Sequence, residues 1–294
     1  MIRRAAVLWD RVWFAPVSAR MFRATRLILA LQALWIILSR PDIPSLTSWP
    51  AAFFPASERM MYLRFGIVQG TTVFEWPLYA LLHLLLILIV AGLRWRAVLF
   101  AAGLLLYHFA PFEEIIAGIP HTSFGGLTVS AVGLMLLSFV RQPGAEETSP
   151  QDRWPVVLIQ LFFTFTYFFA FLAKLRWAGP GWFTASNMQF WALVNYGFSQ
   201  PPLARALASS TLICWAAAIG TLLFEALSPL AVFSSRFRVL WVAAAVLFHL
   251  GIALTLNIAY TSTPLLLLFV DWDRVSDWLR SARSLRRSPV EAGS

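Results

Sequence analysis

The stretch VVLIQLFFTFTYFFAFLAKLRW, residues 156–177, decides the fold class of this chain. Its side chains are mostly apolar or aromatic, and none is charged before Lys174. About 20 such residues are what an α-helix needs to cross the ~30 Å hydrocarbon core of a bilayer. A helix also satisfies its own backbone hydrogen bonds at that depth. The stretch therefore predicts a membrane-spanning helix.

The rest of the sequence has the same character. Of its 294 residues, 59% are hydrophobic and only 13% are charged, with a mean hydropathy of +0.71. Soluble domains carry about 25% charged residues. Further apolar runs extend the prediction to spans near residues 22–39, 77–93, 97–112, 122–140, 155–174, 207–233, 239–256 and 258–270. We therefore expect an all-α, polytopic integral membrane helix bundle with about eight transmembrane helices, in a range of roughly seven to nine.

Arginine side chains gather beside these apolar runs, as membrane-flanking residues do. The net charge of +9 is therefore attributed to topology, and no nucleic-acid partner is expected. Eight spans place both termini on one side, and a cytoplasmic assignment puts 17 of the 23 basic residues inside. This follows the positive-inside rule. It predicts a cytoplasmic amphipathic arginine-rich lead-in (1–20), a transmembrane domain (21–272) and a cytoplasmic basic tail (273–294).

A few ionisable residues lie inside or beside the predicted spans. Each costs about 2.5–3.5 kcal/mol at a helix centre, so each marks a candidate functional position. They are His83, His108, Glu225 and His249 inside spans, and Glu75, Glu113, Glu114, His121 and Lys174 at the outer edge. The histidines lack the spacing of a metal-binding motif, and the single cysteine excludes a CxxC pair, so no metal site is predicted. The topology instead predicts a polar pocket that opens outward.

Lys174 is the only lysine among the 23 basic residues. A cation at the end of a span often only extends its charge to the membrane surface. Arginine does this equally well, whereas burial can leave a lysine neutral and able to act as a base or nucleophile. We therefore interpret Lys174 as a functional base or nucleophile. Tyr167 lies seven residues earlier on the same helical face and is expected to line the same pocket.

Glu225 and His249 leave several interpretations open. Glu225 lies deep in a predicted span with no cation within one helical turn. It is either a neutral carboxyl group hydrogen-bonded between helices, a partner of Lys174 or His249, or part of a proton relay. His249 is either a packing residue or a member of the same polar group.

Three stretches together resemble the membrane part of vitamin K-dependent gamma-carboxylase and its bacterial relatives, the HTTM (horizontally transferred transmembrane) family. The first is a Tyr-Phe-x-Ala-x-x-x-Lys-Leu pattern followed by tryptophan, and it comprises Tyr167, Phe168, Ala170, Lys174 and Leu175, then Trp177 or Trp182. The second is HTSFGGL (121–127), with His121, Gly126 and Leu127 in register. The third is Glu225 followed by Phe248 and His249. The resemblance covers roughly residues 20–272.

The resemblance implies a quinol-dependent enzyme in a bacterial inner (plasma) membrane. It implies that Lys174 deprotonates a vitamin K-type quinol such as menaquinol and that His121 assists at the quinone. The remaining pocket residues are expected to be Tyr167, Trp177, Trp182, Glu225 and His249. The carboxylase carries a large soluble domain where this chain extends only about two dozen residues past its last predicted span. A small-molecule, peptide or lipid-associated substrate from the outer side is therefore expected.

Two other functions remain open. One is a non-enzymatic membrane partner that binds or matures a secreted peptide. The other is a small-solute or proton-coupled transporter, favoured by Glu225 and the proline-broken segment ALSPL (226–230), although the inverted repeats of many transporters are not visible. The sequence predicts no oligomeric state.

Overall fold

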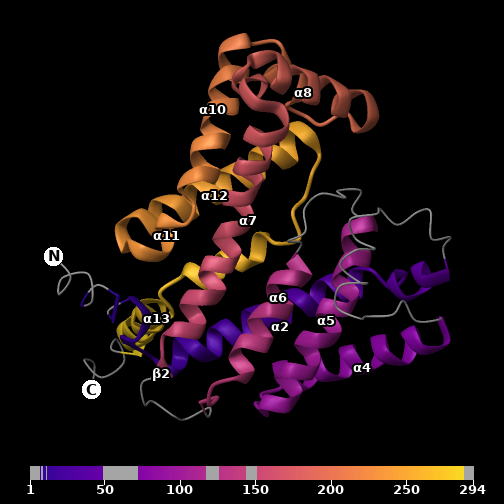
Figure 1. Ribbon diagram of the computed structural model, residues 1–294. Coiled ribbons are helices and arrows are strands. Elements are labelled where there is room, and N and C mark those ends of the chain that lie inside the picture. Colours follow the sequence, from indigo (N-terminus) through magenta and orange to yellow (C-terminus); the bar gives the residue numbers. More distant parts are fainter. Residues whose placement is uncertain are drawn as a thin grey trace.

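A computed structural model describes residues 7, 9–10, 12–48, 72–116, 126–143 and 151–287 (Figure 1). The structure is 83% helical, which confirms the all-α prediction. Among the described residues, extended pairing is limited to the short strands β1 (Pro16–Val17) and β2 (Gln151–Asp152), which are antiparallel. This pair joins the chain before the first long helix to the chain before the longest one.

The helices form two groups that share α7 (Trp154–Ala178). We call the first group the N-terminal bundle; it comprises α2 (Ala19–Ser39), η1 (Ile43–Ser48), α4 (Thr72–Val90), α5 (Arg96–Ile116) and α6 (Gly126–Ser138). The second group, the C-terminal bundle, comprises η3 (Gly179–Phe183), α8 (Ala185–Ser199), α9 (Ala204–Ala208), α10 (Thr211–Leu227), α11 (Leu230–Phe233) and α12 (Ser235–Leu256). Figure 1 shows α7 running from one group into the other.

Within the described ranges, four helices are long and apolar enough to cross a membrane. They are Ala19–Ser39, Val73–Val90, Trp154–Phe183 and Ser235–Leu256, and they correspond to predicted spans 22–39, 77–93, 155–174 and 239–256. Three other predicted spans are helical but shorter, with apolar segments at Arg96–Pro111, Gly126–Ser138 and Thr211–Leu227. The predicted span 207–233 is divided because α10 ends before Pro229, which cannot donate a backbone hydrogen bond.

The prediction of an α-helical span at 258–270 is wrong. Residues 257–262 are non-helical and are followed by η4 (Thr263–Phe269), a 3₁₀ helix only about 14 Å long at roughly 2 Å per residue. Such a backbone needs protein partners at membrane depth. Gln32 Nε2 donates to the Thr261 carbonyl at 3.1 Å, and Gln160 Nε2 donates to the Leu268 carbonyl at 2.7 Å. These buried amides hold the irregular segment against α2 and α7.

The described segments nearest the two termini lie together. α13 (Trp272–Arg287) packs against the beginning of α2, where Arg20 Nη1 lies 3.4 Å from Asp273 Oδ1 and 3.8 Å from Asp277 Oδ1. Irregular segment 257–270 therefore returns the chain from the end of α12 to the end of the bundle where α2 begins.

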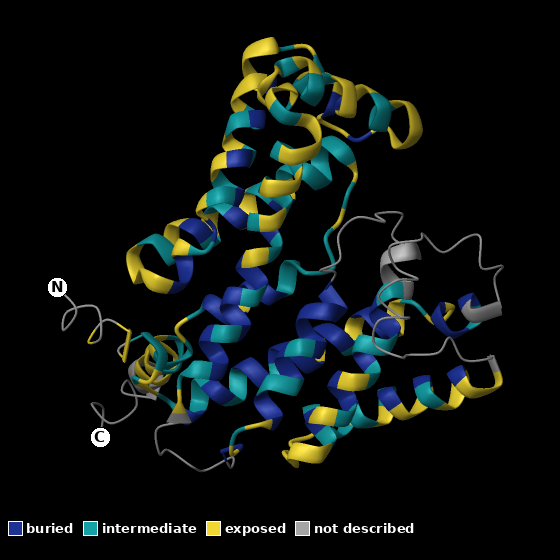
Figure 2. Ribbon diagram, in the orientation of Figure 1, coloured by how far each residue is buried: buried dark blue, intermediate teal, exposed yellow. Residues whose placement is uncertain are grey.

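The outer faces of several helices are apolar. Val73 and Phe74 on α4 and Val239 and Leu247 on α12 are among the most exposed large hydrophobic side chains. Figure 2 shows that burial concentrates in the N-terminal bundle and α7, whereas α8, α10 and α12 have few buried residues. Contiguous apolar surface of this extent is unfavourable in water. The exposed faces therefore suggest a lipid environment.

Gly126 shows how closely α6 approaches the irregular segment. A Cβ atom at this position would collide with Gln32 Nε2 and lie 3.2 Å from the Thr261 carbonyl carbon. Gln32 cannot move freely, because its Oε1 also accepts a 2.5 Å hydrogen bond from Ser130 Oγ. Only glycine fits at this junction without displacing a bonded neighbour.

We therefore expect Gly126→Ala to lower the free energy of unfolding by about 1–3 kcal/mol, as overpacking does elsewhere. The matched control is Gly220→Ala in α10, where a Cβ atom would have no neighbour within 4 Å. That change should stabilise the helix by about 0.5–1 kcal/mol. Thermal unfolding of both variants in detergent checks this difference, and equal effects would contradict the close packing at Gly126.

Candidate functional site

Lys174 and Glu225 form a largely buried ion pair between α7 and α10. Lys174 Nζ lies 2.5 Å from Glu225 Oε1, and the side chains are 19% and 4% exposed, respectively. α7 continues for four residues beyond Lys174, to Ala178. The structure thus pairs Glu225 with Lys174, which is one of the interpretations left open for Glu225.

The end of α7 brings an aromatic ring to the lysine. Gly179, with φ of 53°, ends the helix in a backbone conformation that favours glycine, and Pro180 follows. The chain then turns into η3, which places the Trp182 ring centroid 5.2 Å from Lys174 Nζ. A cation over the face of tryptophan is attracted by the ring quadrupole. Of the predicted pocket residues, Trp182 therefore lies beside Lys174.

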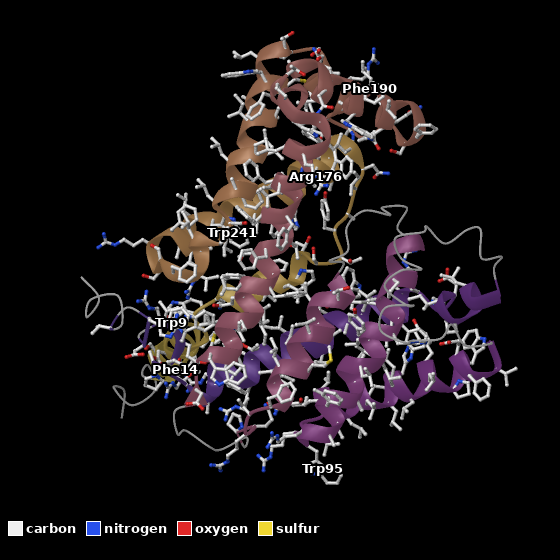
Figure 3. All side chains as sticks on the ribbon, in the orientation of Figure 1. Trp9, Phe14, Trp95, Arg176, Phe190 and Trp241 are labelled. Carbon is white, nitrogen blue, oxygen red and sulfur yellow. The ribbon has the colours of Figure 1, made fainter. Side chains whose placement is uncertain are left out.

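Trp177 points away from the Lys174–Glu225 pair. Its side chain is 79% exposed, and the Arg176 guanidinium lies 5.2 Å from its ring centroid. Figure 3 labels Arg176 on the part of α7 that reaches the C-terminal bundle. Of the two tryptophans that satisfy the sequence pattern, the structure thus selects Trp182.

Tyr167 and His249 form a second polar contact, about 10 Å from Lys174 along α7. The Tyr167 hydroxyl lies 2.8 Å from His249 Nε2, and His249 Nδ1 lies 2.5 Å from Thr263 Oγ1. The Thr263 hydroxyl donates its hydrogen to the Tyr260 carbonyl at 2.8 Å. It can therefore only accept from the histidine, so His249 carries its proton on Nδ1 and Nε2 accepts from Tyr167. Three elements, α7, α12 and η4, meet in this chain of hydrogen bonds.

Aromatic side chains enclose the Tyr167–His249 contact. Phe224 lies 5.3 Å from the Tyr167 ring and stacks on Trp241 with centroids 5.5 Å apart. Trp241, labelled in Figure 3, itself lies 5.5 Å from Tyr167. Phe224 immediately precedes Glu225 in the chain. The two polar contacts are therefore neighbours in an apolar environment, where electrostatic interactions are stronger than in water.

One carboxylate oxygen of Glu225 remains able to accept a hydrogen bond. Glu225 Oε1 binds Lys174, whereas Oε2 is buried and has no hydrogen-bond partner within the described part of the chain. A buried carboxylate oxygen without a partner costs about 1–3 kcal/mol or more. The site can therefore accept a hydrogen-bond donor at Oε2.

Other ionisable groups of the predicted spans lie in the N-terminal bundle. His108 Nε2 lies 2.8 Å from Glu75 Oε2, so α4 and α5 share a carboxylate–imidazole contact there. His83 Nδ1 donates to the carbonyl of Tyr79 one turn earlier at 2.8 Å. No group of three or more His, Cys, Asp or Glu side chains that could hold a metal ion occurs among the described residues.

Several predictions cannot be compared with the structure. His121 lies outside the described residues, as do the side chains of Glu113 and Glu114. The predicted roles of these residues stay predictions. Conversely, Thr263 and Tyr260 were not predicted, although the polar run NIAYTST (257–263) after an apolar span was a signal that could have indicated them.

The Lys174–Glu225 contact joins residues 51 positions apart in the chain, and the Tyr167–His249 contact joins residues 82 positions apart. The similarity to the carboxylase family stays a prediction from the sequence motifs. Comparison of the chain with models of protein families, with curated proteins and with solved structures found no match.

Proposed function

We propose that the chain is a membrane enzyme in which the Lys174–Glu225 pair accepts a proton from a lipid-soluble quinol such as menaquinol. The observation that carries this proposal is the 2.5 Å contact between Nζ and Oε1 together with the unpartnered, buried Oε2 of Glu225. The pair holds a proton between two bases and still has a free acceptor. That combination suits proton abstraction better than it suits a purely structural ion pair.

The residues present fit a quinol by three features. Glu225 Oε2 provides an acceptor for a phenolic hydroxyl group. Trp182 provides a flat aromatic surface beside Lys174, against which another ring can pack. The exposed apolar faces of α10 and α12 suggest that a lipid-soluble molecule reaches the site from the bilayer. A bound quinol would supply a weakly acidic hydroxyl group and two electrons for an oxidation.

Lys174 and Glu225 have distinct parts in this chemistry. Glu225 takes up the proton that Lys174 carries, and the neutral amine then accepts the proton of the substrate hydroxyl group. The positive charge that forms on Lys174 lies beside the developing negative oxygen and stabilises it. Tyr167, held by His249 and Thr263, keeps α7 fixed against α12 and η4, so that Lys174 and Glu225 remain in register.

The proposed topology has eight crossings, seven helical and one made by residues 257–270. Both termini are cytoplasmic, because this places 17 of the 23 basic residues inside. Lys174 then lies toward the outer face of a bacterial inner membrane. A small-molecule or peptide substrate arrives at that face from outside.

Titration of a short-chain menaquinol into protein in nanodiscs, under anaerobic conditions, tests the proposal. We expect the wild type to bind and Lys174→Met/Glu225→Leu to bind at least about tenfold more weakly, because hydrogen bonds to charged groups contribute about 1.5–3 kcal/mol. The matched control is His108→Met/Glu75→Leu, which removes the other buried pair in the same way. It should bind as the wild type does.

Two results would contradict the proposal. If the wild type shows no binding, the chain has a different function, and the peptide-binding partner is then favoured. If both double variants bind equally, the quinol does not use the Lys174–Glu225 pair. A proton-coupled transporter is favoured if only substitution at Glu225 affects function and no quinone can be extracted from the purified protein.

A further inference from the structure

Arg26 is a buried cation that the proposed enzyme site does not use. Its side chain lies on α2 with the residue only 5% exposed. Both Nε and Nη1 are buried and have no hydrogen-bond partner anywhere in the part of the chain that the structure describes. A guanidinium group has five donors and no acceptor, so it needs oxygen atoms around it.

Other arginines of the bundle do find oxygen partners in the protein. Arg96 Nε donates to the Ser138 carbonyl at 2.6 Å, and Arg238 Nε donates to the Ala231 carbonyl at 3.0 Å. Both satisfy carbonyl groups at the ends of neighbouring helices. Nε and Nη1 of Arg26 make no equivalent contact with the described residues. Its position therefore differs from that of a structural arginine.

The surroundings of Arg26 are positively charged. Arg94, in the turn between α4 and α5, and Arg23, one turn earlier on α2, are both close enough to repel it electrostatically. Like charges that converge on a buried, unpaired cation are unfavourable unless an anion lies between them. The three residues come from two separate segments, so the cluster is a product of the fold.

We propose that Arg26, Arg94 and Arg23 bind a phosphate group, and that the group belongs to the headgroup of an anionic phospholipid. Arg26 is the eighth residue of α2, about 10 Å along the helix axis from its beginning at roughly 1.5 Å per residue. A long arginine side chain at this depth reaches the level of the headgroups. The planar guanidinium group matches phosphate oxygens in a bidentate geometry. This site lies in the N-terminal bundle and does not depend on the proposed quinol chemistry.

Thermal unfolding in nanodiscs made of either phosphatidylglycerol or phosphatidylcholine tests this site. We expect the unfolding temperature of the wild type to be about 5–10 °C higher in phosphatidylglycerol than in phosphatidylcholine, because a ligand that binds only the folded state stabilises it. Arg26→Met should lose this rise. In phosphatidylcholine it should unfold at or above the wild-type temperature, since it removes an unpaired buried charge.

Two further variants separate binding from folding. Arg94→Gln, at an exposed position, should reduce the rise without disturbing the core. Arg236→Gln is the matched control, because Arg236 is an exposed arginine on α12 and lies outside the cluster. It should leave the rise unchanged. A rise that Arg94→Gln reduces and Arg236→Gln does not would support the site even if Arg26→Met failed to fold.

Inorganic phosphate added to phosphatidylcholine nanodiscs distinguishes the two sources of the group. If phosphatidylglycerol raises the unfolding temperature and inorganic phosphate does not, the ligand is the lipid headgroup. If inorganic phosphate alone gives a rise that Arg26→Met abolishes, the anion site stands and its lipid assignment is overturned. If Arg26→Met and Arg94→Gln keep the full lipid-dependent rise, or the wild type shows none, the phosphate site itself is overturned.

Discussion

Lys174→Met is expected to lower the free energy of unfolding by about 3–5 kcal/mol, the largest effect on stability that we expect from a single substitution in this chain. Methionine has nearly the length of lysine, so packing changes little. In this variant Glu225, whose side chain is only 4% exposed, loses the partner of Oε1, and Oε2 has no partner to begin with. A buried charge without its partner accounts for the loss. Thermal or denaturant unfolding in detergent measures it.

The double variant Lys174→Met/Glu225→Leu should recover most of that stability. Replacement of a complete buried ion pair by apolar groups is often neutral or stabilising, because the desolvation penalty of both charges disappears. The control for the single variant is Arg176→Met, since Arg176 lies two residues further on α7 beside the exposed Trp177. It should change the free energy of unfolding by less than about 0.5 kcal/mol. A stable Lys174→Met single variant would mean that Glu225 does not depend on Lys174.

Several features around the Lys174–Glu225 pair could be predicted from the sequence. Long apolar runs could be located from the local sequence alone, because about 20 consecutive apolar residues are enough to cross a bilayer as a helix. The placement of Tyr167 and Lys174 on one helical face follows from helical periodicity. Recognition of Glu225 and His249 as unusual intramembrane residues needed only the cost of burying them.

Pairing between helices could not be predicted in the same way. Lys174 and Glu225 lie 51 residues apart, and His108 and Glu75 lie 33 apart on different helices. Which helices meet is decided by packing of the whole bundle, including close approaches such as Gly126 against α2. The predicted helix at 258–270 failed for the same reason. Its apolar residues suit a membrane span, but Gln32 and Gln160 stabilise a backbone there that is not α-helical.

Lys174→Arg is expected to have the largest functional effect, a fall of about 100- to 10,000-fold in quinol-dependent oxygen uptake. Arginine keeps the positive charge and the hydrogen bond to Glu225, so the ion pair and the fold should persist. It cannot release its proton, however, and therefore cannot act as a base. The assay supplies a short-chain menaquinol to protein in nanodiscs, with two electrons and two protons passing from the quinol to dioxygen to give hydrogen peroxide. Rates are taken above those of protein-free nanodiscs.

The rate of Glu225→Gln in the same assay then tests whether the Glu225 carboxylate takes up the lysine proton. Glutamine still accepts a hydrogen bond from Lys174 but cannot take up its proton, so this variant should also be slow if the proton passes from lysine to carboxylate. The unfolding temperature of Lys174→Arg should stay close to that of the wild type, which separates loss of chemistry from loss of structure. Wild-type rates in Lys174→Arg, with a normal fold, would mean that a permanently charged side chain suffices. Lys174 would then be a structural partner of Glu225 and not a base.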